Sequence, residues 1–166
     1  SRGLGDVYKR QLLSPSSHPC QVLSDIFTIE EVKKKFISKL DICWIGDCNN
    51  VLNSLIATSV KFKFNLNVAC PKSYRPPKFV MDWVKKNKRK VNFFIDPNKA
   101  VENADVIFSD KVVSLNDKVN KIKKIKDFKN YQVNSSLIKY AKKDAIFLHC
   151  LPRGNEVSDE VFSGKQ

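Results

Sequence analysis

The amino-acid sequence predicts an α/β fold, a parallel sheet of about five strands with helices on both faces. Short apolar runs alternate with segments of helical periodicity from Pro19 onward. This alternation is typical of parallel strands joined by crossover helices. The chain has 166 residues, 42% of them apolar, and no Pro/Gly/Ser-rich linker divides it after Pro19. It is therefore expected to form one domain with its own core.

The first predicted element is a helix that starts at Pro19. Apolar residues recur at helical spacing as far as Phe36, and proline suits the first helical position. The preceding residues 1–17 have no clear period, and we interpret them as a foreign or misassembled leader outside the fold. Residues 18–40 thus form a first, helical unit, and residues 41–166 carry the alternating pattern.

Five strands, with helices between them, are predicted in the rest of the chain. The predicted strands are short β-like segments at residues 41–45, 65–70, 91–95, 105–109 and 145–148. The predicted helices lie between these segments at residues 49–62, 77–88, 97–102 and 135–142. The lysine-rich residues 117–129 are predicted to be helical or mobile.

The formal net charge of +13 makes nucleic acid a rival partner, since clustered basic surfaces bind phosphate backbones. Much of the excess lies in residues 85–90 and 118–129, where an exposed and solvated helix face is the ordinary explanation. Aromatic residues do not interleave with these runs as a stacking platform would require. We therefore expect solvated helix faces and no nucleic-acid groove.

The five cysteines are odd in number and include no C-x-x-C pair, which argues against a disulfide framework and a thiolate zinc site. His18 and His149 lie near Cys20 and Cys150, but without the spacing of a recognised metal site. No run approaches the roughly 18 apolar residues of a membrane span, and the first residues lack a secretory signal's apolar stretch. A soluble protein of the reducing cytoplasm, without metal, is expected.

Three polar motifs directly follow predicted strands: GDCNN at 46–50, DKVVS at 110–114 and CLP at 150–152. In an open parallel sheet, ligands collect outside the carboxyl ends of the strands. A small polar ligand is therefore predicted at this edge of the sheet. The single glycine of WIGDCNN makes a poor dinucleotide fingerprint, so no Rossmann cofactor is expected.

The motif HPCQ at residues 18–21 places His18 at the start of the predicted helix and Gln21 in its first turn. Unpaired backbone N–H groups at a helix start favour anions. A capping histidine with an ordinary surface glutamine is the better explanation of H-P alone. With the wider pattern HPCQ-x-x-x-D, which ends at Asp25, an anion site becomes the better explanation.

His149 and Cys150 are adjacent in the motif HCLP. Neighbours on extended backbone point to opposite sides, so His149 is badly placed to activate Cys150. A covalent thiol mechanism is therefore not expected. In isolation, Cys150 also fits the description of a small buried apolar residue.

The motifs HPCQ, WIGDCNN, DKVVSL and HCLP occur in the order in which the ornithine carbamoyltransferases carry them, and the chain resembles that family. The resemblance implies transfer of a carbamoyl group from carbamoyl phosphate to L-ornithine, giving L-citrulline and phosphate in arginine biosynthesis, without a cofactor. It implies a Rossmann-like, C-terminally truncated ornithine-binding domain at residues 41–166 and an interdomain helix at 18–40. Without the family's S-T-R-T-R loop and closing C-terminal helix, the chain resembles an inactive fragment of a homotrimeric enzyme.

The resemblance assigns carbamoyl phosphate to His18, Gln21, Cys150 and the backbone around Leu151. His18 is implied to polarise the carbonyl oxygen as charge develops on it. Cys150 and Asp110 are implied to orient the amine of ornithine. The implied catalytic residues are therefore His18, Asp110 and Cys150.

The resemblance assigns ornithine to Asn50, Asp110, Ser114 and Leu115. Asp110 can accept hydrogen bonds from an ammonium group, and Ser114 adds a smaller donor and acceptor. An aspartate at the end of a strand is also a common cap or turn residue. The neighbours of Asn50 in the motif, Asp47 and Asn49, are interpreted as structural.

The chain departs from the family pattern at several places. Cys48 stands where relatives commonly have glycine, and Arg153 follows HCLP directly, which indicates a shorter loop. The pattern D-T-W-x-S-M-G is changed at four positions, Lys111, Val112, Leu115 and Asn116. The loss of the family's tryptophan and methionine, at Val112 and Leu115, is expected to loosen ornithine recognition or to mark a subfamily.

Other acceptors and another class of protein stay open. Aspartate carbamoyltransferase shares H-P-x-Q and typically carries H-P-L-P-R, which Arg153 echoes. Cys150 in place of proline and the D-x-x-x-S segment favour ornithine. Carbamoyltransferases for acetylated or succinylated ornithine also fit. From another class, a basic nucleic-acid-binding module without catalytic activity fits the charge.

Overall fold

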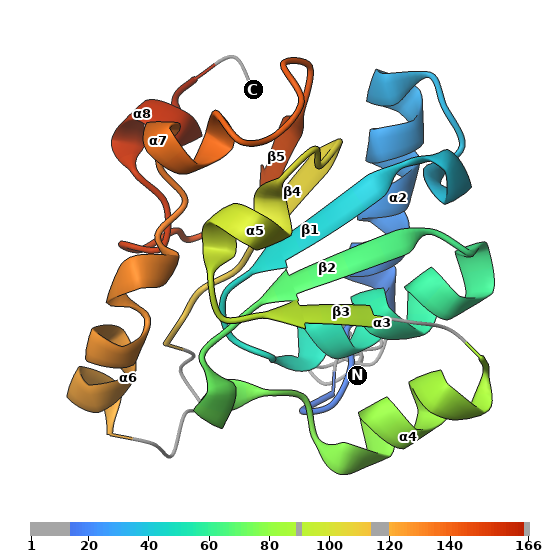
Figure 1. Cartoon of the computed structure of the whole chain (residues 1–166), viewed down its shortest axis with the longest axis horizontal. Helices are drawn as coiled ribbons and strands as arrows, with labels where there is room; N and C mark the ends of the chain where they lie inside the picture. The colour runs from blue at the N-terminus through green and yellow to red at the C-terminus, as the bar shows by residue number, and fades with distance from the viewer. Residues whose placement is uncertain (1–13, 89–90, 114–119, 165–166) are drawn as a thin grey trace, which may run out of the picture.

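The computed structural model describes residues 14–88, 91–113 and 120–164. These residues form a five-stranded sheet in the order β3-β2-β1-β4-β5, in which every neighbouring pair is parallel (Figure 1). The strands are β1 (Asp41–Ile45), β2 (Asn65–Ala69), β3 (Val91–Phe94), β4 (Val106–Ser109) and β5 (Ile146–His149). The predicted α/β fold with a parallel sheet is confirmed.

Helices cover both faces of this sheet (Figure 1). One face shares an apolar cluster with α2 (Pro19–Lys33), α3 (Asn50–Phe62) and α4 (Lys78–Lys86). The other face shares a second cluster with α5 (Pro97–Val101), α7 (Ser135–Ile138) and α8 (Asp159–Phe162). The helix α6 (Lys121–Asp127) leads into this second cluster at Phe128.

The side chains of the central strand β1 alternate between the two apolar clusters. Ile42 and Trp44 belong to the cluster with α2, α3 and α4, whereas Cys43 belongs to the other cluster together with Ile45. Successive side chains of a strand point to opposite faces. Because both faces are covered by helices, every residue of β1 after Asp41 is apolar and buried.

The predicted boundaries of the strands agree with the structure to within one residue at each end. The first helix ends at Lys33 and does not reach Phe36, because Lys34 adopts a left-handed backbone conformation with φ 51°. The helix α8 was not predicted, since four residues are too few to show a helical period. Three single 3-10 turns were also not predicted: Ile37–Lys39, Lys72–Tyr74 and Lys129–Tyr131.

The expectation of a solvated lysine face over residues 118–129 is wrong at one residue. Lys121, Lys123 and Lys126 are exposed, but Lys124 is only 2% exposed. Its ammonium group forms an ion pair with Asp47, which offsets the cost of removing the charge from water. Residues 118 and 119 of this run lie outside the described part of the chain.

The proposed division into residues 1–17, 18–40 and 41–166 stays a prediction. Residues 1–13 lie outside the described ranges. The next residues contact α3, since Asn50 Nδ2 donates to the Ser14 carbonyl at 3.0 Å and Asn53 Nδ2 donates to the Ser16 carbonyl at 3.2 Å. No helix within the described ranges is long and apolar enough to cross a membrane.

Candidate active site

The order of the strands reverses between β1 and β4, since β2 and β3 lie on one side of β1 and β4 and β5 on the other. Open α/β sheets bind ligands at such a switch point. A small cavity of about 20 Å³ lies here, where α2 meets the carboxyl ends of β4 and β5. Its lining includes three predicted site residues and seven others: Gln21, Asp110 and Cys150, with Asp25, Trp44, Val51, Phe108, Ser109, Leu148 and His149.

The register of the sheet brings Asp110 and Cys150 together. Ser109, the last residue of β4, pairs with His149, the last residue of β5. The residues that follow therefore leave two neighbouring strands side by side. The Cys150 thiol donates a hydrogen bond to Asp110 Oδ1. Two residues that lie 40 positions apart in the sequence thus share one site.

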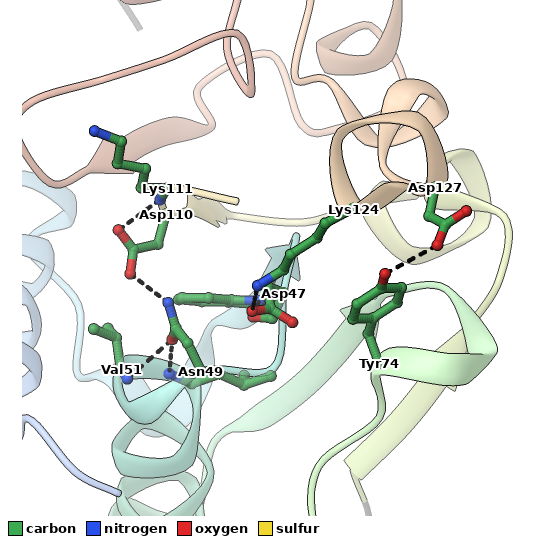
Figure 2. A network of polar contacts seen from close by, with 10 residues as sticks. Asp47, Asn49, Val51, Tyr74, Asp110, Lys111, Lys124 and Asp127 are labelled. Atoms are coloured by element: carbon green, nitrogen blue, oxygen red, sulfur yellow. Dashed lines mark hydrogen bonds and ion pairs between the residues drawn. The ribbon is translucent and has the colours of Figure 1, made fainter. Parts of the chain in front are cut away.

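Asp110 is buried, with 9% of its surface exposed, and its carboxylate is held by several donors. Its Oδ2 accepts a hydrogen bond of 2.6 Å from Asn49 Nδ2, and its Oδ1 accepts one of 2.7 Å from the backbone N–H of Lys111 (Figure 2). With the Cys150 thiol, these donors fix the orientation of the carboxylate. Asp110 is therefore an oriented acceptor at the end of β4.

Cys150 stands in this site as a neutral thiol. Burial, together with the hydrogen bond and the charge of Asp110, raises the pKa of the thiol to about 12. His149 does not lower it, because its Nε2 lies 3.1 Å from Glu156 Oε1, and the Cys150 thiol is directed to Asp110. The expectation that His149 and Cys150 do not form a catalytic dyad is confirmed in their geometry.

The motif HPCQ starts α2, and His18 is the residue before its first helical position, as predicted. The His18 side chain does not cap the helix, and its backbone N–H donates to Ser54 Oγ at 2.8 Å. Its Nδ1 is buried and has no hydrogen-bond partner among the described residues. Gln21 reaches the small cavity, where its Nε2 donates to Asp25 Oδ1 at 2.9 Å. Of the four residues of this motif, only Gln21 lines the small cavity, which Asp110 also lines.

The two asparagines of WIGDCNN have different positions. Asn49 caps α3, since its Oδ1 accepts from the backbone N–H groups of Val51 and Leu52 at 3.0 and 3.1 Å. This confirms the structural role predicted for Asn49. Asn50 lies in the first position of α3 and does not line the small cavity. Its contact with ornithine stays a prediction.

The remaining predicted site residues lie apart from this cavity or outside the described ranges. Leu151 is 76% exposed and follows Cys150 at the end of β5. Ser114 and Leu115 lie outside the described part of the chain. Their assignment to ornithine, like that of the Leu151 backbone to carbamoyl phosphate, stays a prediction.

Asp25 is a site residue that the sequence indicated only as part of the HPCQ-x-x-x-D pattern. It lines the cavity together with Asp110. Burial raises the pKa of Asp25 from 3.8 to about 6; the hydrogen bond from Gln21 acts against this shift, and the charge of Asp110 adds to it. The position of the carboxylate on the buried side of α2 could have been predicted from its helical spacing to Val22 and Ile29.

We expect the Asp25→Asn variant to gain stability relative to the wild type as pH rises from about 4 to about 7. Between pH 3.8 and about 6, the folded chain binds the Asp25 proton more tightly than the unfolded chain does. The contribution of this group to the free energy of unfolding therefore falls as pH rises through that window. Asparagine cannot ionise, yet it keeps an oxygen for the Gln21 amide.

Urea unfolding of both proteins across this pH range measures the difference, in which the titration of groups that do not interact with Asp25 cancels. A difference in midpoint that does not change with pH would contradict the role of Asp25.

A larger cavity of about 690 Å³ lies between residues 111–113, α6 and residues 154–156. Its lining is mostly apolar and contains none of the predicted site residues. Binding sites for small polar molecules need a few convergent polar groups. Gln21, Asp110 and Cys150, three predicted site residues, supply such groups at the smaller cavity, and we therefore take it as the candidate site.

Residues 38–166 match a family described as aspartate/ornithine carbamoyltransferase, Asp/Orn binding domain. Among curated relatives, an ornithine carbamoyltransferase of Mesorhizobium japonicum is 44% identical over 154 residues, which are 92% of this chain and 50% of that protein. One of Methanosarcina acetivorans is 42% identical over 154 residues, 92% of this chain and 51% of that protein. The chain thus spans about half the length of these relatives.

Solved structures of ornithine carbamoyltransferases also resemble this chain. The anabolic ornithine carbamoyltransferase of Campylobacter jejuni superposes with a TM-score of 0.85 at 36% identity, covering 91% of this chain and 52% of that one. The enzyme of Pyrococcus furiosus superposes with a TM-score of 0.82 at 38% identity, covering 92% and 50%. In both, the similarity extends over nearly all of this chain and about half of the other.

Proposed function

The chain belongs to the aspartate/ornithine carbamoyltransferase family, and we propose that it is the amino-acid-binding half of an ornithine carbamoyltransferase. The reaction would transfer the carbamoyl group of carbamoyl phosphate to the δ-amine of L-ornithine and release L-citrulline and phosphate. The observation that carries the proposal is the pairing of Asp110 with Cys150 at the switch point of the sheet.

Asp110 and Cys150 are a pair of side chains that can hold an amine in a defined orientation. The buried carboxylate of Asp110 can accept a hydrogen bond from the δ-amine and favours its approach as a cation. The amine must lose a proton before it attacks the carbonyl carbon. The Cys150 thiol, with its pKa raised to about 12, stays neutral at physiological pH and so serves as a hydrogen-bonding partner of the amine, not as a nucleophile.

The start of α2 supplies the groups proposed for carbamoyl phosphate. His18 stands directly before the first turn of α2, at a helix start, which favours anions, and Gln21 lies on the cavity. Phosphate is already a good leaving group, so the site must mainly align the amine and stabilise the oxyanion of the tetrahedral intermediate. We propose that His18 acts on the carbonyl oxygen and that the backbone near Leu151 meets the carbamoyl group.

Ornithine is the acceptor that the relatives favour, since those named above are ornithine carbamoyltransferases. We propose Asn50, Asp110, Ser114 and Leu115 as its binding residues. A place in arginine biosynthesis, a cytoplasmic location and a homotrimer are also proposed, on the resemblance to the family. A nucleic-acid-binding module is not favoured, because the relatives named above resemble nearly all of this chain and are carbamoyltransferases.

Citrulline formation by the full-length protein that contains this chain tests the proposal. Carbamoyl phosphate is offered with L-ornithine, L-aspartate or N-acetyl-L-ornithine in parallel, and the chain of 166 residues is assayed alone beside it. We expect turnover with ornithine only, and little or none by the chain alone, since it spans about half the length of the relatives it matches. Preference for another acceptor would overturn the ornithine assignment, and salt-sensitive DNA binding without turnover would overturn the enzyme assignment.

A further inference from the structure

The helix α6 carries one lysine that is directed inward. Lys124 is 2% exposed, although Lys121, Lys123 and Lys126 of the same helix are exposed. Its Nζ lies 2.6 Å from Asp47 Oδ2, and the two side chains are 3% and 17% exposed (Figure 2). A buried ammonium group is costly unless it is paired, and the pair requires a fixed geometry. The position of α6 relative to Asp47 is therefore specified.

A second contact holds α6 at the same place. The Tyr74 hydroxyl donates to Asp127 Oδ2 at 2.9 Å, and Lys124 Nζ lies 5.9 Å from the centre of the Tyr74 ring (Figure 2). A cation over an aromatic face adds an attraction to the ion pair. Tyr74 thus meets two residues of α6, one turn apart, and helps to keep Lys124 directed at Asp47.

Asp47 lies in the loop between β1 and α3, residues 46–49. Its carbonyl accepts a hydrogen bond of 3.1 Å from the indole N–H of Trp44, so the loop is held at its backbone as well as at its carboxylate. Two residues later, Asn49 both caps α3 and donates to Asp110 at 2.6 Å. A chain of contacts therefore runs from Lys124 to Asp47, continues along the backbone to Asn49, and reaches Asp110 through the Asn49 amide.

The ion pair holds a loop that lies beside proposed ornithine residues. Asp47 lies three positions before Asn50, and Asn49 of the same loop donates to Asp110. We infer that Lys124 is a positioning residue for ornithine, which acts through Asp47 to hold the loop of residues 46–49 beside Asp110. This inference rests on the proposed function. The carbamoyl-phosphate residues of α2 are not part of this chain of contacts.

Steady-state kinetics of the full-length protein test the inference with the Lys124→Met variant. The KM for L-ornithine is expected to rise on the order of tenfold, because small displacements far from the reacting atoms can cost up to about a hundredfold. The KM for carbamoyl phosphate is expected to stay within about twofold and kcat within about threefold, since only the amino-acid half is displaced. Lys123→Met, an exposed lysine of the same helix, is the matched control and should leave all three constants unchanged.

Two further variants separate positioning from a loss of folding. Lys124→Arg keeps a cation that can pair with Asp47, and it should recover most of the ornithine affinity. Combining Asp47→Asn with Lys124→Met should cost no more than the more damaging single change, because both remove the same pair. An equal rise of both KM values, or additive losses, would overturn the inference.

Amide hydrogen exchange gives a readout that does not depend on turnover. Exchange in residues 46–50 should be faster in Lys124→Met than in the wild type, whereas exchange in α4 should not change. Absence of turnover in the wild type would defeat the proposed function, and exchange would then still decide whether Lys124 holds the loop. Unchanged exchange in residues 46–50 would overturn the positioning role, whatever the activity.

Discussion

The Asp110→Asn variant of the full-length protein is expected to lose on the order of a thousandfold in kcat/KM for L-ornithine. Asparagine has nearly the same shape but only one acceptor oxygen. In the wild type, Oδ2 accepts from Asn49, and Oδ1 accepts from the Lys111 N–H and the Cys150 thiol. The NH₂ group of asparagine would therefore face one of these donors, and that hydrogen bond would be lost. The negative charge that attracts the amine would also be lost.

Citrulline formation at varied ornithine concentration measures this loss. Asp82→Asn is the matched control, because Asp82 lies on the outer face of α4, 52% of its side chain is exposed, and its carboxylate pairs with Lys78 of the same helix. We expect the control to retain the wild-type constants. A loss of less than tenfold in Asp110→Asn would show that the carboxylate does not bind the acceptor.

The Trp44→Ala variant is expected to lower the free energy of unfolding by about 3–5 kcal/mol. Trp44 is 1% exposed at the centre of the sheet, and its ring stacks against Phe108 of β4 with centroids 6.5 Å apart. Its indole N–H also donates to the Asp47 carbonyl at 3.1 Å. Alanine would leave a cavity between β1 and α2 and α3, and it would release the loop that follows β1.

Urea unfolding of the chain, followed by circular dichroism, measures this effect without relying on tryptophan fluorescence. Trp44→Phe separates the two contributions, because it keeps an aromatic ring and deletes the N–H group. Its loss should be smaller than that of Trp44→Ala. A loss below about 2 kcal/mol in Trp44→Ala would contradict the central packing role of this residue.

The central strands β1 and β4 could be predicted from the sequence because both are buried on both faces. A continuous apolar run such as residues 42–45 is best explained as a buried strand when helical patterns alternate with such runs along the chain. The short helix α8 and the early end of α2 could not be predicted. Four residues show no period, and the left-handed conformation of Lys34 depends on the packing of the following turn.

The chemistry of the candidate site was also indicated by the sequence. Polar motifs that follow apolar runs predict side chains at the carboxyl edge of a parallel sheet, and Asp110 and Cys150 lie there. The sequence also showed that His149 and Cys150 would diverge, since neighbours on a strand point apart. These inferences need only local geometry, which the order of the residues determines.

Contacts between distant residues were decided by the tertiary structure. The pairing of Ser109 with His149 sets Asp110 against Cys150, and the packing of α2 brings Gln21 to the same cavity. Lys124 belongs to a lysine run whose composition indicates a solvated face. Its side chain is buried because α6 packs next to Asp47, with which its ammonium group forms an ion pair. Apolar periodicity specifies which face of an element is buried, whereas strand order and register determine which polar groups meet at its ends.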